Sequence, residues 1–173
     1  MVKQEKPETF TLEGAEILFR NFSGKPGTFN AEGDRNFCVI LPEHVAAKMI
    51  EAGMNVRELK PREEDDAPKP YIQVKVKYRG RKGLVKPPRV VLITSSGRTN
   101  LGEDDVNVLD FADIRRVDLI INPYRGVING REFTAAYLKT LFVTIEEDEL
   151  ERKYAATEDS ARNVIPEDDL PWS

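Results

Sequence analysis

The feature that most constrains the fold of this sequence is the pair Asn129-Gly130, which lies between two long segments with the character of strands. Asn-Gly is the favoured pair for a type I′ turn, whose twist matches that of two antiparallel strands. Residues 117–128 and 131–145 are therefore predicted to form a β-hairpin. A hairpin of this length indicates a fold built mainly from β-strands.

Other segments carry strand and helix patterns. Residues 71–78 alternate most cleanly, with one face formed by Ile72, Val74, Val76 and Tyr78 and the other by Tyr71, Gln73, Lys75 and Lys77. Further strands are predicted over residues 9–20 (with Gly14 at a bulge), 35–41, 55–60 and 89–94. Short helices are predicted from Pro42 to Gly53 and over residues 103–114.

This order of elements predicts a mainly β fold of about six or seven strands. An elaborated small β-barrel of the oligonucleotide-binding type (OB-fold-like), with one or two short helices, fits it best. Within that fold we expect Phe19 to face the core, because it shares strand parity with Ile17. Val106, Leu109 and Phe111 are expected to face partly inward from the second helix.

The charge of the chain is divided unevenly. From Glu146 to the end there are ten acids and three bases, a net charge of −7, whereas the first 145 residues carry a net charge of +3. Residues 155–163 are small and polar and cannot offset the entropy cost of folding alone. Residues 1–154 are therefore predicted to form one domain, and residues 155–173 a disordered, flexible acidic tail.

Several classes of protein are disfavoured. No apolar run is long enough to cross a bilayer, and the first ten residues lack the apolar segment of a secretory signal. Cys38 has no cysteine with which to form an internal disulfide, and His44 alone cannot complete a zinc site around it. We expect an intracellular protein with no membrane contact, no metal and no cofactor.

Basic residues gather in the segment 71–100, which contains no acid. They are Lys75, Lys77, Arg79, Arg81, Lys82, Lys86, Arg89 and Arg98. Such a run can be a solvated strand face, or it can bind the phosphates of a nucleic acid.

Aromatic residues are interleaved with cations in the polar loop 21–34 and beside it. A protein that binds an unpaired strand needs cations along the phosphates and flat rings on which bases stack. Phe22 and Phe29 are the predicted stacking rings, with Tyr71 on the polar strand face, and Arg20 and Lys25 add charge. The alternative is that the two phenylalanines anchor the loop by packing.

Enzymatic alternatives rest on weaker patterns. There is no phosphate-binding GxxxxGK[ST] loop, and His44 lies beside no nucleophile motif, as expected of a surface or capping residue. A magnesium-dependent nuclease could use the acids between residues 103 and 118, although acids along one short helix are also typical of a solvated surface. They are Glu103, Asp104, Asp105, Asp110, Asp113 and Asp118. A protein-interaction adaptor with a β core is the other alternative.

The chain ends in an acidic peptide with an apolar tip. The tip residues are Asp168, Asp169, Leu170, Pro171 and Trp172, followed by Ser173. Exposed apolar groups on a tail suggest a peptide that docks into a partner's pocket, with the acids meeting basic residues around it. The alternative is that the tip packs on its own domain.

Two resemblances support a nucleic-acid role. Residues 167–172 resemble the acidic tip of bacterial single-stranded DNA-binding proteins, with Trp172 in place of the terminal phenylalanine and Ser173 added after it. The segments 17–41, 70–81, 87–101 and 136–154 resemble phage-encoded single-stranded DNA-binding proteins.

The resemblance implies an OB fold that protects single-stranded DNA during phage replication or recombination in the cytoplasm of the bacterial host. It also implies recruitment of replication or recombination proteins through the tip. A homodimer is suggested only by analogy. The resemblance does not say which side chains contact DNA.

Overall fold

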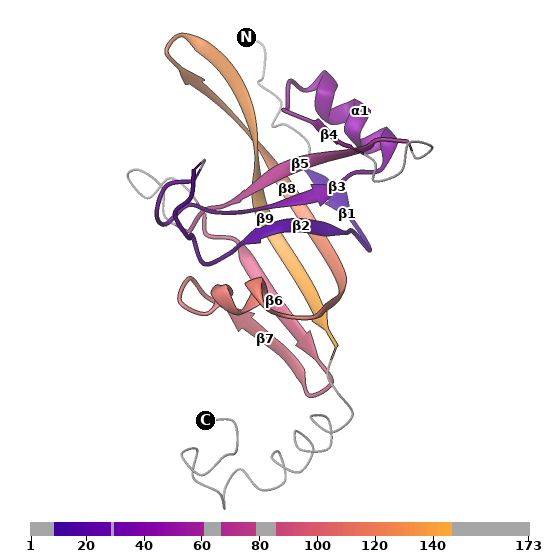
Figure 1. Ribbon diagram of the computed structural model, residues 1–173, viewed down its shortest axis with the longest axis vertical. Helices are drawn as coiled ribbons and strands as arrows, with labels where there is room; N and C mark the ends of the chain where they lie inside the picture. The colour runs from indigo at the N-terminus through magenta and orange to yellow at the C-terminus, as the bar shows by residue number, and fades with distance from the viewer. Residues whose placement is uncertain (1–8, 29, 61–66, 79–85, 147–173) are drawn as a thin grey trace, which may run out of the picture.

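The computed structural model describes residues 9–28, 30–60, 67–78 and 86–146, which are mostly strand (Figure 1). In chain order the elements are β1 (Phe10–Leu12), β2 (Ile17–Asn21), β3 (Arg35–Ile40), α1 (Glu43–Glu51), β4 (Arg57–Leu59), β5 (Lys69–Val76), β6 (Arg89–Thr94), β7 (Gly97–Leu101), the 3-10 helix η2 (Val106–Asp110), β8 (Ile114–Ile128) and β9 (Arg131–Ile145). The predicted mainly β fold is confirmed. Strand β7, which pairs with β6, was not predicted.

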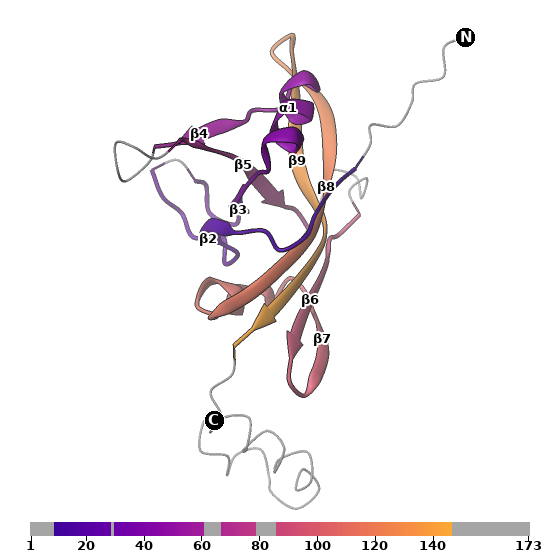
Figure 2. The ribbon, with the colours of Figure 1, turned by 90° about the vertical axis from the view of Figure 1, so that its right-hand side faces the viewer.

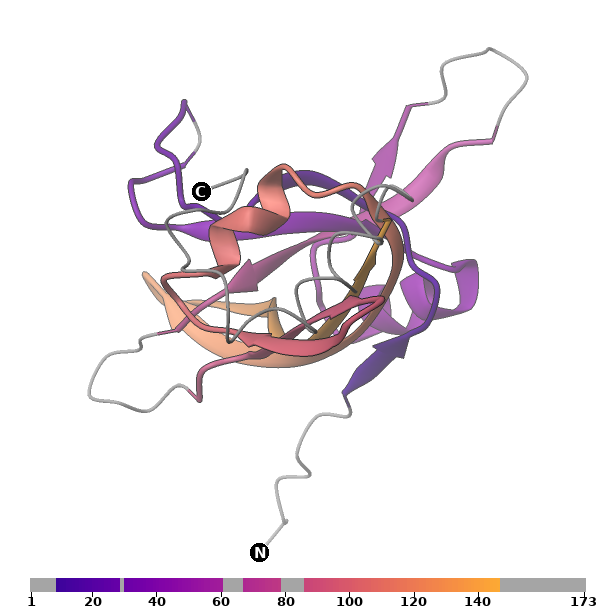
Figure 3. The same ribbon diagram turned by 90° about the horizontal axis from the view of Figure 1, so that it is seen from below.

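The sheet curls into an open barrel whose two end strands are neighbouring parts of the chain. The strand order is β1-β8-β9-β5-β3-β2, and only residues 13–16 separate β1 from β2. On one side the Ala15 N–H donates to the Val117 carbonyl at 2.8 Å, and on the other the Ile40 N–H donates to the Glu16 carbonyl at 3.0 Å. Seen from below, the strands curve around a common centre (Figure 3).

Gly14 lies at the corner between these two strands. Its φ of +61° is in the left-handed region that favours glycine, and its N–H donates to Asp118 Oδ1 at 2.8 Å. The single bulged strand predicted over residues 9–20 is therefore two strands that pair with opposite ends of the sheet.

The β8–β9 hairpin forms as predicted. Asn129 and Gly130 have φ values of +53° and +76°, as a type I′ turn requires. The turn end extends beyond the barrel in Figure 1. The other edge of β9 pairs with two parallel strands in succession, β5 and then β6. Strands β6 and β7 lie at one end of the molecule, and α1 and β4 lie at the other (Figure 2).

The core is filled by apolar side chains from the barrel strands, α1 and η2. Val45 and Met49 of α1 are buried, but Ile50 is exposed. In the described ranges no polar or charged residue is fully buried. No helix within them has the length and apolar character needed to span a membrane.

Candidate nucleic-acid interface

The outer face of β5 carries the polar side chains that the alternation predicts. Ile72 and Val74 are buried in the barrel, whereas Lys75 and Lys77 are exposed. Tyr71 is half-buried on the same outer face. The strand thus presents a ring and two ammonium groups to solvent.

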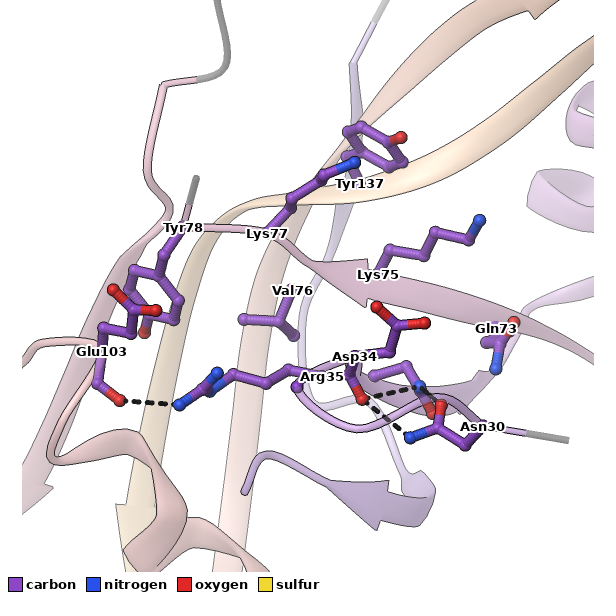
Figure 4. A pocket seen from close by; sticks show the side chains of 12 residues that line it. Asn30, Asp34, Arg35, Gln73, Lys75, Val76, Lys77, Tyr78, Glu103 and Tyr137 are labelled. Carbon is purple, nitrogen blue, oxygen red and sulfur yellow. Dashed lines mark hydrogen bonds between the residues drawn. The ribbon is translucent and has the colours of Figure 1, made fainter. Parts of the chain in front are cut away.

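A hollow of about 440 Å³ lies between this face and the loop that precedes β3 (Figure 4). It is lined by Asn30, Gly33, Asp34, Arg35, Asn36, Gln73, Lys75, Val76, Lys77, Tyr78, Glu103 and Tyr137. In Figure 4 Lys77 extends from the end of β5 toward Tyr137. Because most of these side chains are polar or charged, the hollow suits a ligand that is charged and hydrogen-bonding.

The loop wall of the hollow is held by the side chain of Asn30. Its Nδ2 donates to the carbonyl oxygens of Lys25 at 2.8 Å, Ala31 at 3.2 Å and Asp34 at 3.0 Å. Its Oδ1 accepts a hydrogen bond from Asn36 Nδ2 at 2.8 Å. One side-chain amide therefore links three backbone carbonyls of the loop to the start of β3.

A pair of stacked tyrosines stands next to β5 on the hairpin. The rings of Tyr124 and Tyr137 are 5.0 Å apart between centroids and within 3° of parallel. The β5–β9 register places Lys75 beside Tyr137, and Lys77 Nζ lies 5.9 Å from the Tyr137 ring centroid. Burial, together with the neighbouring Tyr124, raises the pKa of Tyr137. Its phenol is therefore neutral at neutral pH.

Tyr124 and Tyr137 are not among the site residues predicted from the sequence. Tyr137 lies between Ala136 and Leu138, which both face the core, so strand parity alone could have placed it outside. Strand alternation does not predict the register of β5 and β9, which brings Tyr137 beside Lys75 and Lys77. Tyr124 is 47% exposed and reaches the same cluster from β8.

Phe22 does not have the predicted role. Its side chain is fully buried and stacks on Phe37, with ring centroids 5.2 Å apart. Its backbone N–H donates to Asp110 Oδ1 at 2.6 Å. The prediction that this ring stacks on bases is wrong, because the start of the loop turns inward against η2.

Phe19 shows the opposite error. It was expected in the core, yet it is 65% exposed and its ring lies 6.4 Å from that of Tyr71. The pairing of β2 with β3 shifts between Leu18 and Asn21, and Phe19 has a φ of +50°. This irregularity breaks the two-residue alternation and turns the ring outward.

Arg20 is used within the fold. Its Nη1 donates to the carbonyl oxygens of Leu109 at 2.9 Å and Ala112 at 2.8 Å.

Lys25 Nζ lies 5.2 Å from the ring centroid of Phe111. Phe111 was expected to face partly inward but is 78% exposed, so this cation and ring lie together on the surface.

The other predicted site residues fall into two groups, those that the structure describes and those outside the described residues. Lys86, Arg89 and Arg98 are exposed, and the two arginines lie beside the ring of Phe142. The other predicted site residues lie outside the described residues: Phe29, Arg79, Arg81, Lys82 and the tip residues 168–172.

Arg35 and Tyr78 both line the hollow, and their side chains lie close together. Arg35 Nη2 donates to the Glu103 carbonyl oxygen at 3.2 Å, and its guanidinium lies 5.9 Å from the Tyr78 ring centroid. Arg35 Nε and the Tyr78 hydroxyl are buried with no hydrogen-bond partner in the described ranges. Burial raises the pKa of Tyr78 to about 12, against the opposing effect of the Arg35 charge.

Two of the acids considered for magnesium binding hold backbone in place. Asp110 accepts hydrogen bonds from the N–H groups of Phe22 and Ser23 and from the Ser23 hydroxyl. Asp118 accepts the N–H of Gly14 at the barrel corner. Among the residues that the structure describes, no three His, Cys, Asp or Glu side chains form a group suited to a metal ion.

The sequence matches the family model described as "Putative phage ssDNA-binding domain" over residues 1–170. The chain belongs to this family. Comparison with curated proteins gave no match.

The fold of this family member is similar to that of the single-stranded DNA-binding protein from bacteriophage Enc34. The structure of that protein in complex with ssDNA aligns with a TM-score of 0.53 and 10% identity, over 81% of this chain and 88% of that chain. A second structure of that protein aligns with a TM-score of 0.50 and 11% identity, over 81% of this chain and 82% of that chain. At this identity the likeness shows the fold alone, and it confirms the predicted OB-fold-like barrel.

Proposed function

We propose that the protein binds single-stranded DNA with little sequence preference, on the outer face of β5 and the adjoining tyrosine pair. The observation that carries the proposal is the placement of exposed Lys75 and Lys77 beside the stacked rings of Tyr124 and Tyr137. Cations follow the phosphate backbone, and aromatic faces stack on any base. Membership of the phage family supports the same ligand.

The contacts are proposed to extend along both sides of this surface. Tyr71 and Phe19 offer rings at one end. Basic residues from the segment after β5 add charge; they are Arg79, Arg81, Lys82 and Lys86, with Arg89 and Arg98 farther along, where only longer strands reach. Arg20 is omitted because its guanidinium binds backbone carbonyls.

The acidic tail is proposed to compete with DNA for this surface. The segment from Glu146 to the end, which includes the tail, carries a net charge of −7 against +3 for the preceding residues, so the carboxylates of the tail can stand in for phosphates. Deletion of residues 156–173 should tighten binding of oligo-dT at low salt, because the competitor is removed. Unchanged or weaker binding would argue against the competition.

The tip is proposed to recruit replication or recombination proteins once DNA displaces the tail. Its acids, proline and tryptophan provide charge, a pre-set backbone and an apolar anchor. The role is a binding role and not an enzymatic one. An adaptor that binds only proteins would leave oligo-dT unbound, and a nuclease would degrade labelled DNA when magnesium is added.

A gel-shift comparison of single-stranded and duplex oligonucleotides across a salt series tests the proposal. We expect oligo-dT to shift at lower protein concentration than duplex DNA of equal length, with affinity falling steeply as salt rises. Absence of an oligo-dT shift in dilute buffer would refute it.

A further inference from the structure

Phe142 of β9 lies on the barrel surface beside two arginines. The Arg89 guanidinium carbon is 5.7 Å from its ring centroid, and that of Arg98 is 6.0 Å away. The ring is half-buried and both arginines are exposed. We refer to these three residues as the Phe142 patch.

A register shift turns this ring to the same side of β9 as Tyr137. Five positions separate the two residues, and an odd spacing in a regular strand would place them on opposite faces. Ile120 pairs with Thr140 but Ile121 pairs with Leu138, so Lys139 is an extra residue in β9. Tyr137 and Phe142 therefore both face outward, roughly 16 Å apart along the strand.

The burial pattern supports this geometry. Before the shift the even-numbered Ala136 and Leu138 face the core, and after it the odd-numbered Leu141 and Val143 do so. β-Bulges commonly re-aim side chains next to functional sites.

The surroundings of the two rings are alike. Beside Tyr137 the parallel partner of β9 is β5, with its lysines; beside Phe142 it is β6, which begins at Arg89. Neither Arg89 nor Arg98 forms an ion pair with any residue in the described ranges. The carboxylate opposite Phe142 in register, Asp118, is already bound to Gly14 and Arg116.

We infer that the Phe142 patch is a second contact site for the phosphodiester backbone of the same bound strand. Phe142 is a positioning residue, because a ring beneath each guanidinium holds its plane and leaves its N–H groups free for phosphate oxygens. The strand would leave the tyrosine pair and follow the outer face of β9 to the patch. This inference rests on the proposed function, but it concerns only DNA long enough to reach both places.

Affinities for an oligo-dT length series test the inference. Lengths from about 4 to about 20 nucleotides span the site sizes of single OB folds. For the variant Arg89→Gln/Arg98→Gln we expect wild-type affinity for the shortest strands that bind, but weaker binding of long strands. The salt slope for long strands should fall by about 1.4, since each phosphate contact on a single strand contributes about 0.7.

Controls separate this site from general charge effects. Lys48→Gln/Lys60→Gln removes the same charge near α1 and β4, and it should leave the salt slope unchanged. Phe142→Leu retains an apolar cover but no ring, and it should lower the long-strand slope by a smaller amount. Equal melting temperatures would show that the variants are folded.

Two results would overturn the inference while the proposed function stands. One is an arginine variant that matches wild type at every length; the other is an equal loss at every length, which would make the patch part of the first contact. Failure of the wild-type protein to bind any oligo-dT would instead refute the proposed function.

Discussion

Strand β5 and the loop 21–34 carry the same kind of sequence signal, aromatic rings among cations, but the fold uses them differently. On β5 the lysines are exposed beside two stacked tyrosines of the hairpin. In the loop segment Phe22 is buried, and the neighbouring Arg20 binds two backbone carbonyls. In a strand, alternation fixes which side chains face outward. In a loop, composition does not, because the backbone can turn any residue inward.

The largest expected effect is in the loop. Phe22→Ala should lower the free energy of unfolding by about 3–5 kcal/mol, because it leaves a cavity against Phe37. Oligo-dT affinity of the folded protein should be unchanged. Urea denaturation and fluorescence anisotropy measure the two quantities.

The matched control is Phe19→Ala, three residues earlier. That ring is 65% exposed, so its removal should change stability by less than about 1 kcal/mol. If Phe22→Ala weakened DNA binding and left stability intact, the contrast between loop and strand would be wrong.

The next effect is on the hairpin beside β5. Tyr137→Leu removes one ring of the tyrosine pair. It should weaken oligo-dT binding by about 1–3 kcal/mol, the usual contribution of one base stack. Titration of labelled oligo-dT at fixed salt provides the measurement. Stability should fall much less than for Phe22→Ala because Tyr137 is only half-buried. Wild-type affinity in this variant would exclude the tyrosine pair from the interface.

These contrasts show which parts of the fold were predictable. Local signals sufficed for the β8–β9 turn and for the two faces of β5, because turn chemistry and alternation act over a few residues. The corner at Gly14 was recognised only as a bulge. The separation of β1 from β2 depends on the pairing of β1 with β8, which is distant in sequence, and of β2 with β3.

The candidate site was less predictable for the same reason. Lys75 and Lys77 follow from alternation, but Tyr137 joins them only through the parallel β5–β9 register. Phe19 is exposed because of a register shift that no short pattern reveals. Phe22 is buried against Phe37, where its backbone N–H donates to Asp110, which is far along the chain.

The smallest effect concerns Tyr78, which follows β5 and points inward. The Tyr78 pKa is about 12 in the folded protein and about 10 in an unfolded chain. Neutral Tyr78 therefore contributes stability that is complete below about pH 10 and is lost as the pH rises toward about 12. In Tyr78→Phe the loss of stability over this interval should be smaller than in wild type.

Near pH 8 the same variant should differ from wild type by less than about 1 kcal/mol, because a buried hydroxyl with no hydrogen-bond partner among the described residues contributes little. Its oligo-dT affinity should be unchanged. Urea denaturation near pH 8 and near pH 11 measures the first effect. Parallel pH profiles for the two proteins would contradict the shifted pKa.

The most direct test of the DNA-binding face is the salt dependence of oligo-dT affinity for Lys75→Ala/Lys77→Ala. Both side chains are exposed, so the melting temperature should stay close to that of wild type. If the two lysines contact phosphates, the slope of log K against log salt should fall by about 1.4. A slope equal to that of wild type would show that the DNA lies elsewhere.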